Sequence, residues 1–540
     1  MPRTSAVALT AALVLGVVGG CADTPHYSPE VTTYYVSPDG DDSAPGTSAD
    51  RAWRTLARAD ELLLHPGDRL LLQGGTRLSG QVAIRPDEAG DPERPVVIGS
   101  YGKGRATVVA TGAPAVSVHN TGGVDISDLV LEGRGSARTD EAGVSLYYDD
   151  TRTRTRESHV TLADIDVSGF QTGIAIGSAI TGAGFSDVTV RRASLHDNKD
   201  AGLLTYGPDF EPERPVYAHQ DITVEQVDAH SNSGDPEASE RHTGNGIVLG
   251  GVHRAVVRDS SAHDNGGSAA IDAPGGPVGM WAYDSANVLM QHNTAYRNHT
   301  GSGKDGSGFG LDSNVSGSTV QYNLSYQNDG SGYYAYSQTA NGAHTNNRIR
   351  YNISDDDGRK LPWHGALTVY GDNVSNLSIY QNTVTMSRSP GGDGTVVLLR
   401  PDINGISFRN NLLVSDRDPL ITADAALSAD RVVFQGNQYH TAGGPWRVEW
   451  GASAYGTLDA WRADTGQERV GAKPAGTTAD PCLAGGPLPD IRSAGNASLA
   501  VSGCPRTGLD LRALFGIDPG TEDFFGREVT APPVIGAAQP

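Results

Sequence analysis

Three aspartates and a lysine within one short stretch are the residues best suited to catalysis. Asp305 and Asp329 each precede Gly-Ser-Gly, Lys304 precedes Asp305, and Asp312 ends the run Gly308–Asp312. Two carboxylates across a groove are the minimum for glycoside hydrolysis: one protonates the leaving oxygen, and the other activates water or attacks the anomeric carbon. The first catalytic candidates are therefore Asp312 and Asp305, with Asp329 and Lys304 beside them.

The same aspartates also suit a purely structural role. Asp before Gly-Ser-Gly favours a tight turn, so turn formation is the alternative for Asp305 and Asp329. Asp-rich turns also offer the oxygen ligands that calcium prefers. Asp39, Asp41 and Asp42 form a separate acidic turn of this kind. We expect that no cofactor is required, with Ca²⁺ as the alternative.

Aromatic residues recur at alternating positions close to these carboxylates. Sugar rings stack on aromatic faces through their apolar C–H surfaces, although such aromatics can also cover apolar surface under loops. A long polar loop before Gly246 could overhang the same place and contact a substrate. The sequence predicts substrate contacts from Trp281, Tyr283, Tyr206, Tyr334, Tyr336, Arg241 and His242.

These candidates lie in a repeat that extends from about Val116 to Ser415. Five copies end in an asparagine, and the spacings between these asparagines are 34, 33, 33 and 30 residues. Each copy contains a glycine, a strand of four or five residues and then a second short strand. Such strands cannot bury a face alone, but coils stacked on each other bury a continuous interior. The repeat therefore predicts an all-β fold, a parallel β-helix solenoid; a β-propeller would need a four-stranded unit of about 40 residues.

Alternation along the strands sets which side chains face outward. It places Phe309 and Leu311 inside the solenoid and Gly310 and Asp312 outside. The asparagine at each turn can bond the backbone of its own turn or stack on the asparagine of the next coil.

Segments at both ends of the repeat are similar to those of a known superfamily. At the start these are Tyr34–Asp42, Trp53–Leu56 and Pro66–Leu72; at the end they are Asn437–Tyr439, Leu458–Trp461, Asp523–Gly526 and Ile535–Ala537. The chain resembles the right-handed parallel β-helix (pectate-lyase-like) superfamily over nearly all of its mature length. The resemblance implies a carbohydrate-active protein with a short capping helix through Leu64. It also implies that the substrate lies across the first sheet.

One stretch bears on the choice of reaction. Asp305–Leu311 looks like the segment of the family-nine polysaccharide lyases that carries their catalytic lysine between Phe and Leu. Gly310 stands at that place here, although Lys304 is near. Because a lyase needs a base there, we expect a glycoside hydrolase that acts on a polysaccharide or glycan. The alternatives are a calcium-dependent polysaccharide lyase that uses Lys304 and a non-catalytic glycan-binding surface protein.

The ends of the chain predict export. Arg3 and the apolar residues 6–18 lead to Val18–Cys21, which resembles a bacterial lipobox in which Cys21 is lipidated; an ordinary secretory signal is the alternative. We expect a lipid-anchored protein on the extracellular face of the membrane, or a secreted one. The remaining cysteines, Cys482 and Cys504, predict a disulfide in an exported chain. The expected divisions are a signal peptide (1–20), a tether (21–31), an N-terminal cap with first coils (32–110), the β-helix (111–440) and a C-terminal extension (441–540).

The charge excludes some partners. The net charge is −22 at pH 7, which argues against nucleic acid or an anionic membrane surface as a partner. We expect membrane contact only through the lipid, and a monomer. No histidine pair has the His-Glu-x-x-His spacing of zinc proteases.

Overall fold

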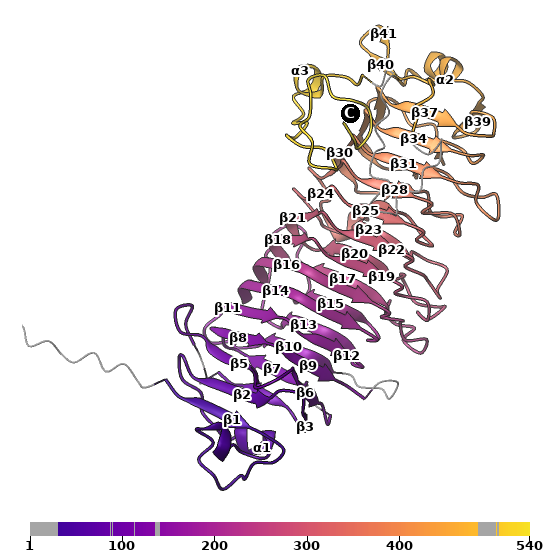
Figure 1. The fold of residues 1–540 in the computed structure, drawn as a ribbon. Helices are drawn as coiled ribbons and strands as arrows, with labels where there is room; N and C mark the ends of the chain where they lie inside the picture. Colours follow the sequence, from indigo (N-terminus) through magenta and orange to yellow (C-terminus); the bar gives the residue numbers. More distant parts are fainter. Residues whose placement is uncertain are drawn as a thin grey trace, which may run out of the picture.

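The computed structural model is an elongated solenoid with the N-terminal cap at one end and the C-terminal segments at the other (Figure 1). It describes residues 31–539 apart from 87, 89, 113, 135–140, 484–503 and 505–506. The predicted signal peptide, the lipidation site Cys21 and nearly all of the tether lie outside the described residues, so these stay predictions. Within the described chain, no helix is long and apolar enough to cross a membrane.

One sheet of the solenoid, the first sheet, carries the candidate site. In the described chain it holds 14 strands, and all its neighbours pair in parallel except the last two. In spatial order the strands are β4 (Val82–Ile84), β7 (Val116–His119), β10 (Ala142–Tyr148), β13 (Thr172–Ser178), β15 (Ala201–Tyr206), β17 (Asn245–Gly250), β20 (Val278–Tyr283), β23 (Ser307–Leu311), β26 (Tyr333–Ser337), β29 (Leu367–Gly371), β32 (Val397–Leu399), β35 (Ile421–Ala423), β38 (Val448–Trp450) and β39 (Ser453–Tyr455).

Two further parallel ladders complete each coil, and the long strands β14 and β16 belong to both of them. The second ladder is β1 (Thr33–Val36), β2 (Arg69–Gln73), β5 (Val96–Tyr101), β8 (Val124–Ser127), β11 (Arg156–Ala163), β14 (Gly184–His196), β16 (His219–His230), β18 (Val252–Arg258), β21 (Ala286–Gln291), β24 (Thr319–Gln321), β27 (Arg348–Arg350), β30 (Ser375–Tyr380), β33 (Asn404–Arg409) and β36 (Val432–Gln435). The third adds β3 (Arg77–Ser79), β6 (Ala106–Val109), β9 (Leu129–Glu132), β12 (Asp166–Ser168), β19 (Ser261–His263), β22 (Thr294–Tyr296), β25 (Leu324–Tyr326), β28 (Ile353–Asp355), β31 (Thr383–Met386), β34 (Leu412–Ser415) and β37 (Gln438–Thr441).

The repeated asparagines form the ladders that hold the turns in register. Asn265 donates from its side-chain amide to the Asn298 side chain at 2.9 Å and to the Ala229 carbonyl at 3.0 Å. The residue before each ladder asparagine turns the chain in the left-handed region, as Asp264 (φ 54°) and Arg297 (φ 48°) do. Each buried amide thus satisfies the backbone of one coil and the side chain of the next, which confirms the predicted stacking.

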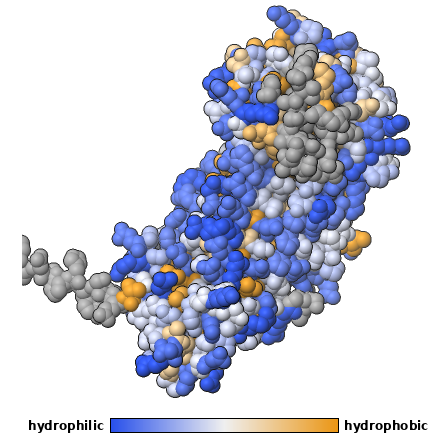
Figure 2. Space-filling model, viewed as in Figure 1, coloured by the Kyte–Doolittle hydropathy of each residue, from blue (hydrophilic) through white to orange (hydrophobic). Residues whose placement is uncertain are grey.

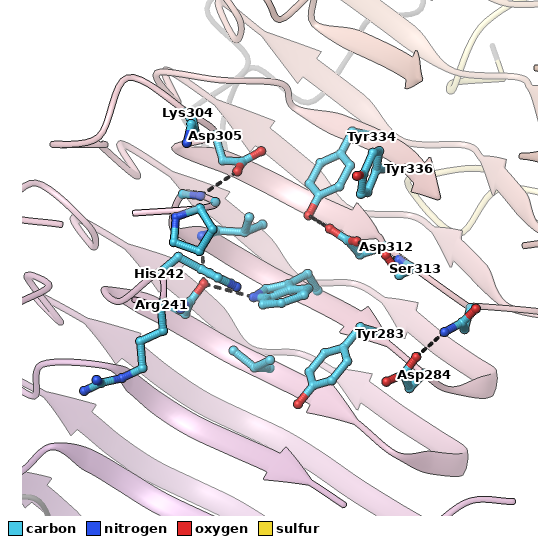
Figure 3. Close-up of a pocket in the computed structure, with 18 of the residues that line it drawn as sticks. Arg241, His242, Tyr283, Asp284, Lys304, Asp305, Asp312, Ser313, Tyr334 and Tyr336 are labelled. Atoms are coloured by element: carbon cyan, nitrogen blue, oxygen red, sulfur yellow. Dashed lines mark hydrogen bonds between the residues drawn. The ribbon is translucent and has the colours of Figure 1, made fainter. Parts of the chain in front are cut away.

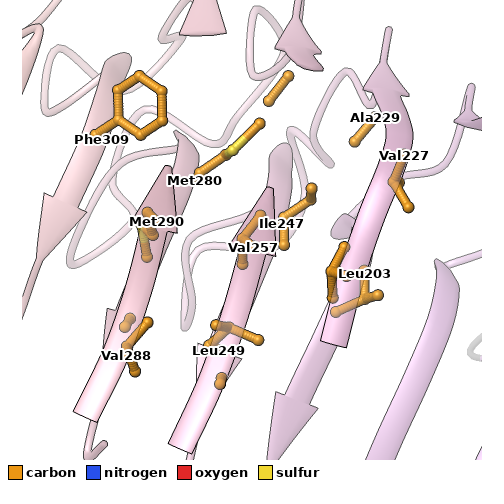
Figure 4. Close-up of a cluster of buried hydrophobic side chains, with 14 of the residues drawn as sticks. Leu203, Val227, Ala229, Ile247, Leu249, Val257, Met280, Val288, Met290 and Phe309 are labelled. Carbon is orange, nitrogen blue, oxygen red and sulfur yellow. The ribbon is translucent and has the colours of Figure 1, made fainter. Parts of the chain in front are cut away.

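The interior is filled by apolar side chains from all three walls, as Figure 4 shows for the central coils. Phe309 is 1% exposed and Leu311 is fully buried, so the predicted inward positions of β23 are confirmed. Phe309 also stacks on Tyr333 of the next coil, with ring centroids 5.2 Å apart. The solenoid is stabilised by burial of these inward-facing apolar side chains along every coil, and not by one central core.

Leu311→Ala should lower the free energy of unfolding by about 2–5 kcal/mol, because it removes buried methyl groups and leaves a cavity. Denaturant unfolding monitored by circular dichroism measures the loss. Leu289→Ala is the matched control, since Leu289 lies on the outward, half-buried side of β21, and it should cost about 1 kcal/mol or less. A loss below about 0.5 kcal/mol at Leu311 would contradict its inward position.

Short elements close the two ends. The N-terminal cap contains η1 (Ala49–Arg51) and α1 (Leu56–Ala59). The predicted helix through Leu64 is wrong in length, because α1 ends at Ala59 with Asp60 as its C-cap. Farther on, the Leu64 N–H bonds the buried Glu88 side chain at 3.2 Å. Strands β38 and β39 extend the first sheet to Tyr455, beyond the expected boundary at 440.

The C-terminal segment folds back along the side of the solenoid. Its elements are α2 (Leu458–Thr465), β40 (Arg469–Val470), β41 (Lys473–Pro474) and α3 (Leu511–Phe515). The Ala537 N–H bonds Thr383 at 2.9 Å, and the Asp518 carbonyl accepts from the Tyr380 hydroxyl at 2.8 Å. The predicted disulfide between Cys482 and Cys504 is present. The surface in Figure 2 is mostly hydrophilic, with hydrophobic residues scattered over it.

Candidate functional site

A groove of about 1040 Å³ lies on the outer face of the first sheet, over strands β15 to β29. Loops that precede successive strands form one wall, with Arg241, His242, Gly276, Asp305 and Trp363 among its residues. The opposite wall comes from residues at the strand ends and from the loop after β15. Because each coil adds one strand and one loop, the groove runs along the solenoid axis.

The loop after β15 forms part of the side wall of this groove. Pro208, Phe210 and Pro212 of this loop line the groove. A Cβ added to Gly342 would lie 2.5 Å from the Pro212 Cβ, so the loop contacts the segment after β26. The loop therefore crosses the ends of the intervening strands and covers the groove beside Tyr283 and Asp284.

Aromatic side chains make up the floor. Trp281 and Tyr334 are 6% and 2% exposed and form one apolar cluster, with Tyr283, Tyr336 and Tyr370 packed against it. The Trp281 indole N–H donates to the Asn245 side chain at 3.0 Å. Because so little of its ring is exposed, Trp281 mainly packs under the other aromatic side chains of the floor. Its stacking on a sugar stays a prediction.

Asp312 lies at the centre of the groove, directly after β23 (Figure 3). Its carboxylate accepts from the Ser313 N–H at 2.6 Å, the Ser313 hydroxyl at 3.0 Å and the Tyr334 hydroxyl at 3.1 Å. Burial raises the pKa of Asp312, and these three donors oppose that rise. Since hydrogen bonds to a carboxylate favour its charged form, Asp312 is the better placed of the two aspartates to carry a negative charge.

Asp305 stands at the other end of the same strand, just before β23, and Tyr334 lies between the two carboxyl groups in Figure 3. Among the described residues, its side chain accepts one hydrogen bond of normal length, from the Gly276 N–H at 2.8 Å. Burial and the nearby negative charge of Asp312 raise the pKa of Asp305 to about 7. Because 16% of its side chain stays exposed, Asp305 can hold a proton at neutral pH and present it to a bound molecule.

His364 packs beside Asp305 without adding a positive charge. Its Nε2 faces the Asp305 N–H at 3.3 Å, and its Nδ1 lies 3.1 Å from the Ser331 hydroxyl, so the ring accepts at Nε2 and donates at Nδ1. Burial lowers the pKa of His364 to about 4. A neutral imidazole leaves the pKa of Asp305 high, whereas an imidazolium would lower it.

A third carboxyl group borders the groove on the side where the strands end. Asp284 follows β20 and accepts a short hydrogen bond from the Asn314 side-chain amide. Burial and Asp312 raise the pKa of Asp284 to about 6, although the Asn314 bond opposes the rise. The Asn314 side-chain oxygen is buried without a hydrogen-bond partner. These two side chains add polar groups that can bind sugar hydroxyls.

Comparison with known proteins agrees with this architecture. A family model described as "Right handed beta helix region" matches residues 216–413. The parallel ladders continue on both sides of that segment. The chain is a right-handed parallel β-helix. The predicted fold class is thereby confirmed.

Among curated proteins, the β-helix is similar to the lacto-N-biosidase of Bifidobacterium longum subsp. longum. The two are 25% identical over an alignment of 475 residues. The match covers 71% of this chain and 29% of that protein. The chain thus spans less than a third of the length of this relative.

Solved structures of two carbohydrate-active enzymes also resemble the β-helix. The GH136 lacto-N-biosidase from Eubacterium ramulus has a TM-score of 0.48 and 16% identity, over 78% of this chain and 68% of that one. The pectate lyase Pel9A has a TM-score of 0.39 and 15% identity, over 75% and 79% of the respective chains.

An aromatic ring covers Gly310, the position at which the family-nine lyases carry their catalytic lysine. A Cβ at Gly310 would lie 2.3 Å from the Tyr334 ring, so no side chain fits there while Tyr334 keeps its place. Lys304 lines the groove, but its ammonium donates to the Ala273 carbonyl at 2.7 Å and so holds the neighbouring loop. Neither position presents a free lysine base in this arrangement.

The structure brings most of the predicted site residues of the β-helix together, with two exceptions. Asp312, Asp305, Lys304, Trp281, Tyr283, Tyr334, Tyr336, Arg241 and His242 all line the groove. Asp329 does not: it pairs with Lys360, accepts from the Thr300 N–H at 3.0 Å and lies near His299. Tyr206 is not among the lining residues either; its ring covers Gly177 of the preceding coil.

Calcium binding, the alternative for the acidic turns, stays a prediction. In the part of the chain that the structure describes, no group of three or more His, Cys, Asp or Glu side chains could hold a metal ion. In the acidic turn, Asp41 caps Ser43, and Asp42 binds the Arg54 and Thr55 N–H groups. That turn therefore has a structural role in fixing the start of α1.

Sequence reasoning did not select several residues of the groove in this β-helix. Trp363 and His364 stand in the loop before β29 and line the groove. Arg400 lines the same end. Counted back from the paired residues Phe309, Tyr333 and Leu367, Trp363 has the same place before its strand as Asp305 and Asp329, so an alignment on this register would have selected Trp363.

Proposed function

We propose that this protein is a glycoside hydrolase in which Asp305 is the general acid and Asp312 is the nucleophile or general base. One observation carries the proposal: two carboxyl groups share a groove, and their hydrogen-bond surroundings differ. Asp312 accepts three hydrogen bonds, while Asp305 is held protonated by burial and by the charge of Asp312. Pairs of carboxyl groups with pKa values pushed apart in this way are typical of glycosidases.

The reaction then follows from the two roles. As the bond between the anomeric carbon and the glycosidic oxygen breaks, the Asp305 proton passes to that oxygen. The Asp312 carboxylate either attacks the anomeric carbon or takes a proton from the water that attacks it. Water supplies the hydroxyl that ends on the released sugar, so each turnover consumes one water and makes one new reducing end. The Tyr334 hydroxyl holds Asp312 in position at 3.1 Å.

The relatives suggest which glycan to test first. The similarity to proteins named lacto-N-biosidase supports a glycan that ends in lacto-N-biose as substrate. The part of the groove toward β15 suits the terminal sugars, because the polar side chains of Arg241 and His242 line it. The Tyr334 ring covers Gly310 and leaves no room there for the lysine base of a lyase, which supports hydrolysis over the lyase reaction.

The proposal is tested by the products. Purified protein is incubated with glycans that end in lacto-N-biose and with a panel of polysaccharides, including uronate polymers. We expect new reducing ends without ultraviolet absorbance. Unsaturated ends that absorb in the ultraviolet would identify a lyase, and binding without any product would identify a glycan-binding protein.

A further inference from the structure

An exposed tryptophan stands at the β29 end of the groove. Trp363 lines the groove and is 60% exposed, whereas Trp281 on the floor is 6% exposed. The Arg400 guanidinium lies over its ring, 5.1 Å from the centroid, and Arg400 in turn lies 3.8 Å from Asp424. A cation over one face fixes the ring and leaves the rest of the indole available for a ligand.

The position of Trp363 relative to the two carboxyl groups suggests what it contacts. Trp363 directly precedes His364, whose Nε2 lies 3.9 Å from the Asp305 carboxylate. Both carboxyl groups belong to the coil of β23, so the bond that breaks lies over that coil. Sugars on one side of the bond point toward β20 and β15, and those on the other side point toward β29 and Trp363.

The two ends of the groove differ in a way that orients the substrate. Toward β15, Arg241 and His242 from the loop before β17 supply polar groups, and Arg241 pairs with Asp200. At the β29 end, Trp363 stays open to solvent. A polar end suits a terminal sugar unit of defined structure, and an exposed aromatic end suits the remainder of a glycan that continues into solvent.

We infer that Trp363 is the platform on which the first sugar of the leaving group stacks, so that it determines how well glycan leaving groups are recognised. This inference rests on the proposed hydrolase function. The expected ligand is a neutral pyranose, which places its apolar C–H face on the free indole face while its glycosidic oxygen receives the proton from Asp305.

The experiment compares two substrates that share the transferred sugar and differ in the leaving group. One is a lacto-N-biose-ended oligosaccharide, or whichever glycan the wild type hydrolyses. The other is the glycosyl fluoride of the same released unit, which has no leaving sugar. Trp363→Ala should lower kcat/KM on the oligosaccharide about tenfold, as expected for the loss of one aromatic stacking contact, and leave kcat/KM on the fluoride within about twofold.

Two further variants separate stacking from folding. Trp363→Phe should recover most of the activity on the oligosaccharide, because it keeps an aromatic face. Ile271→Ala is the matched control: Ile271 is a 73% exposed apolar residue in the loop before β20 that does not line the groove, and its loss should leave both rates unchanged.

The outcomes are distinct. Equal losses on the two substrates would place Trp363 against the transferred sugar and overturn the inference. No loss on either substrate would also overturn it. A wild-type protein that hydrolyses neither substrate nor any glycan of the panel would overturn the proposed function, and this inference with it.

Discussion

Asp312→Asn should lower kcat by at least about 100-fold on any glycan that the wild type hydrolyses, since assistance by a positioned acid, base or nucleophile is typically of that size. Asparagine keeps the shape of the side chain and can still bond Ser313 and Tyr334, but it carries no negative charge. The fold and the affinity for the glycan should therefore be kept. Turnover is followed by the release of reducing ends, and folding by the melting temperature.

Asp329→Asn is the matched control for this loss. It makes the same chemical change in the other Asp-Gly-Ser-Gly segment, but Asp329 pairs with Lys360 and the Thr300 N–H outside the groove. We expect a lower melting temperature and turnover close to that of the wild type. If Asp312→Asn instead kept wild-type turnover with an unchanged melting temperature, Asp312 would have no part in the mechanism.

The contrast between Asp305 and Asp329 shows what the sequence could predict. Alternation along β23 depends only on local geometry, and it correctly placed Leu311 inside and Asp312 on the outer face. The repeated asparagines likewise predicted stacked coils, because their spacing is the length of one coil. These features are encoded within a single repeat and need no knowledge of neighbouring coils.

The parts that could not be predicted depend on contacts between coils. Asp305 and Asp329 are followed by the same three residues, yet their contacts differ. Asp305 accepts a hydrogen bond from the Gly276 N–H in one loop, and Asp329 forms an ion pair with Lys360 in another. The loop lengths that decide such contacts follow no period. For the same reason the burial of Trp281 under its neighbours was not foreseen, because alternation gives the face of a strand and not what covers it.

The pH dependence of turnover should carry the signature of Asp305. Burial and the charge of Asp312 raise the pKa of Asp305 to about 7, so a protonated acid predominates below that pH and disappears above it. We expect kcat/KM on the glycan to fall as the pH rises through about 7. His364, which is neutral because burial lowers its pKa to about 4, contributes no opposing charge over this range. Initial rates between pH 5 and pH 9 on one substrate measure the profile.

Asp305→Asn should remove this acid and reduce kcat/KM on the glycan by about 100-fold or more, while a glycosyl fluoride of the same sugar should still be hydrolysed. Fluoride leaves without protonation, so the step that Asp305 assists is absent from that substrate. Asparagine also fits this position, since Asp305 has φ 53° and Asn tolerates the left-handed region. On the fluoride, neither the wild type nor the variant should show the decline near pH 7. A variant that lost both activities while keeping its melting temperature would show that Asp305 serves the attack on the anomeric carbon and not the departure of the leaving group.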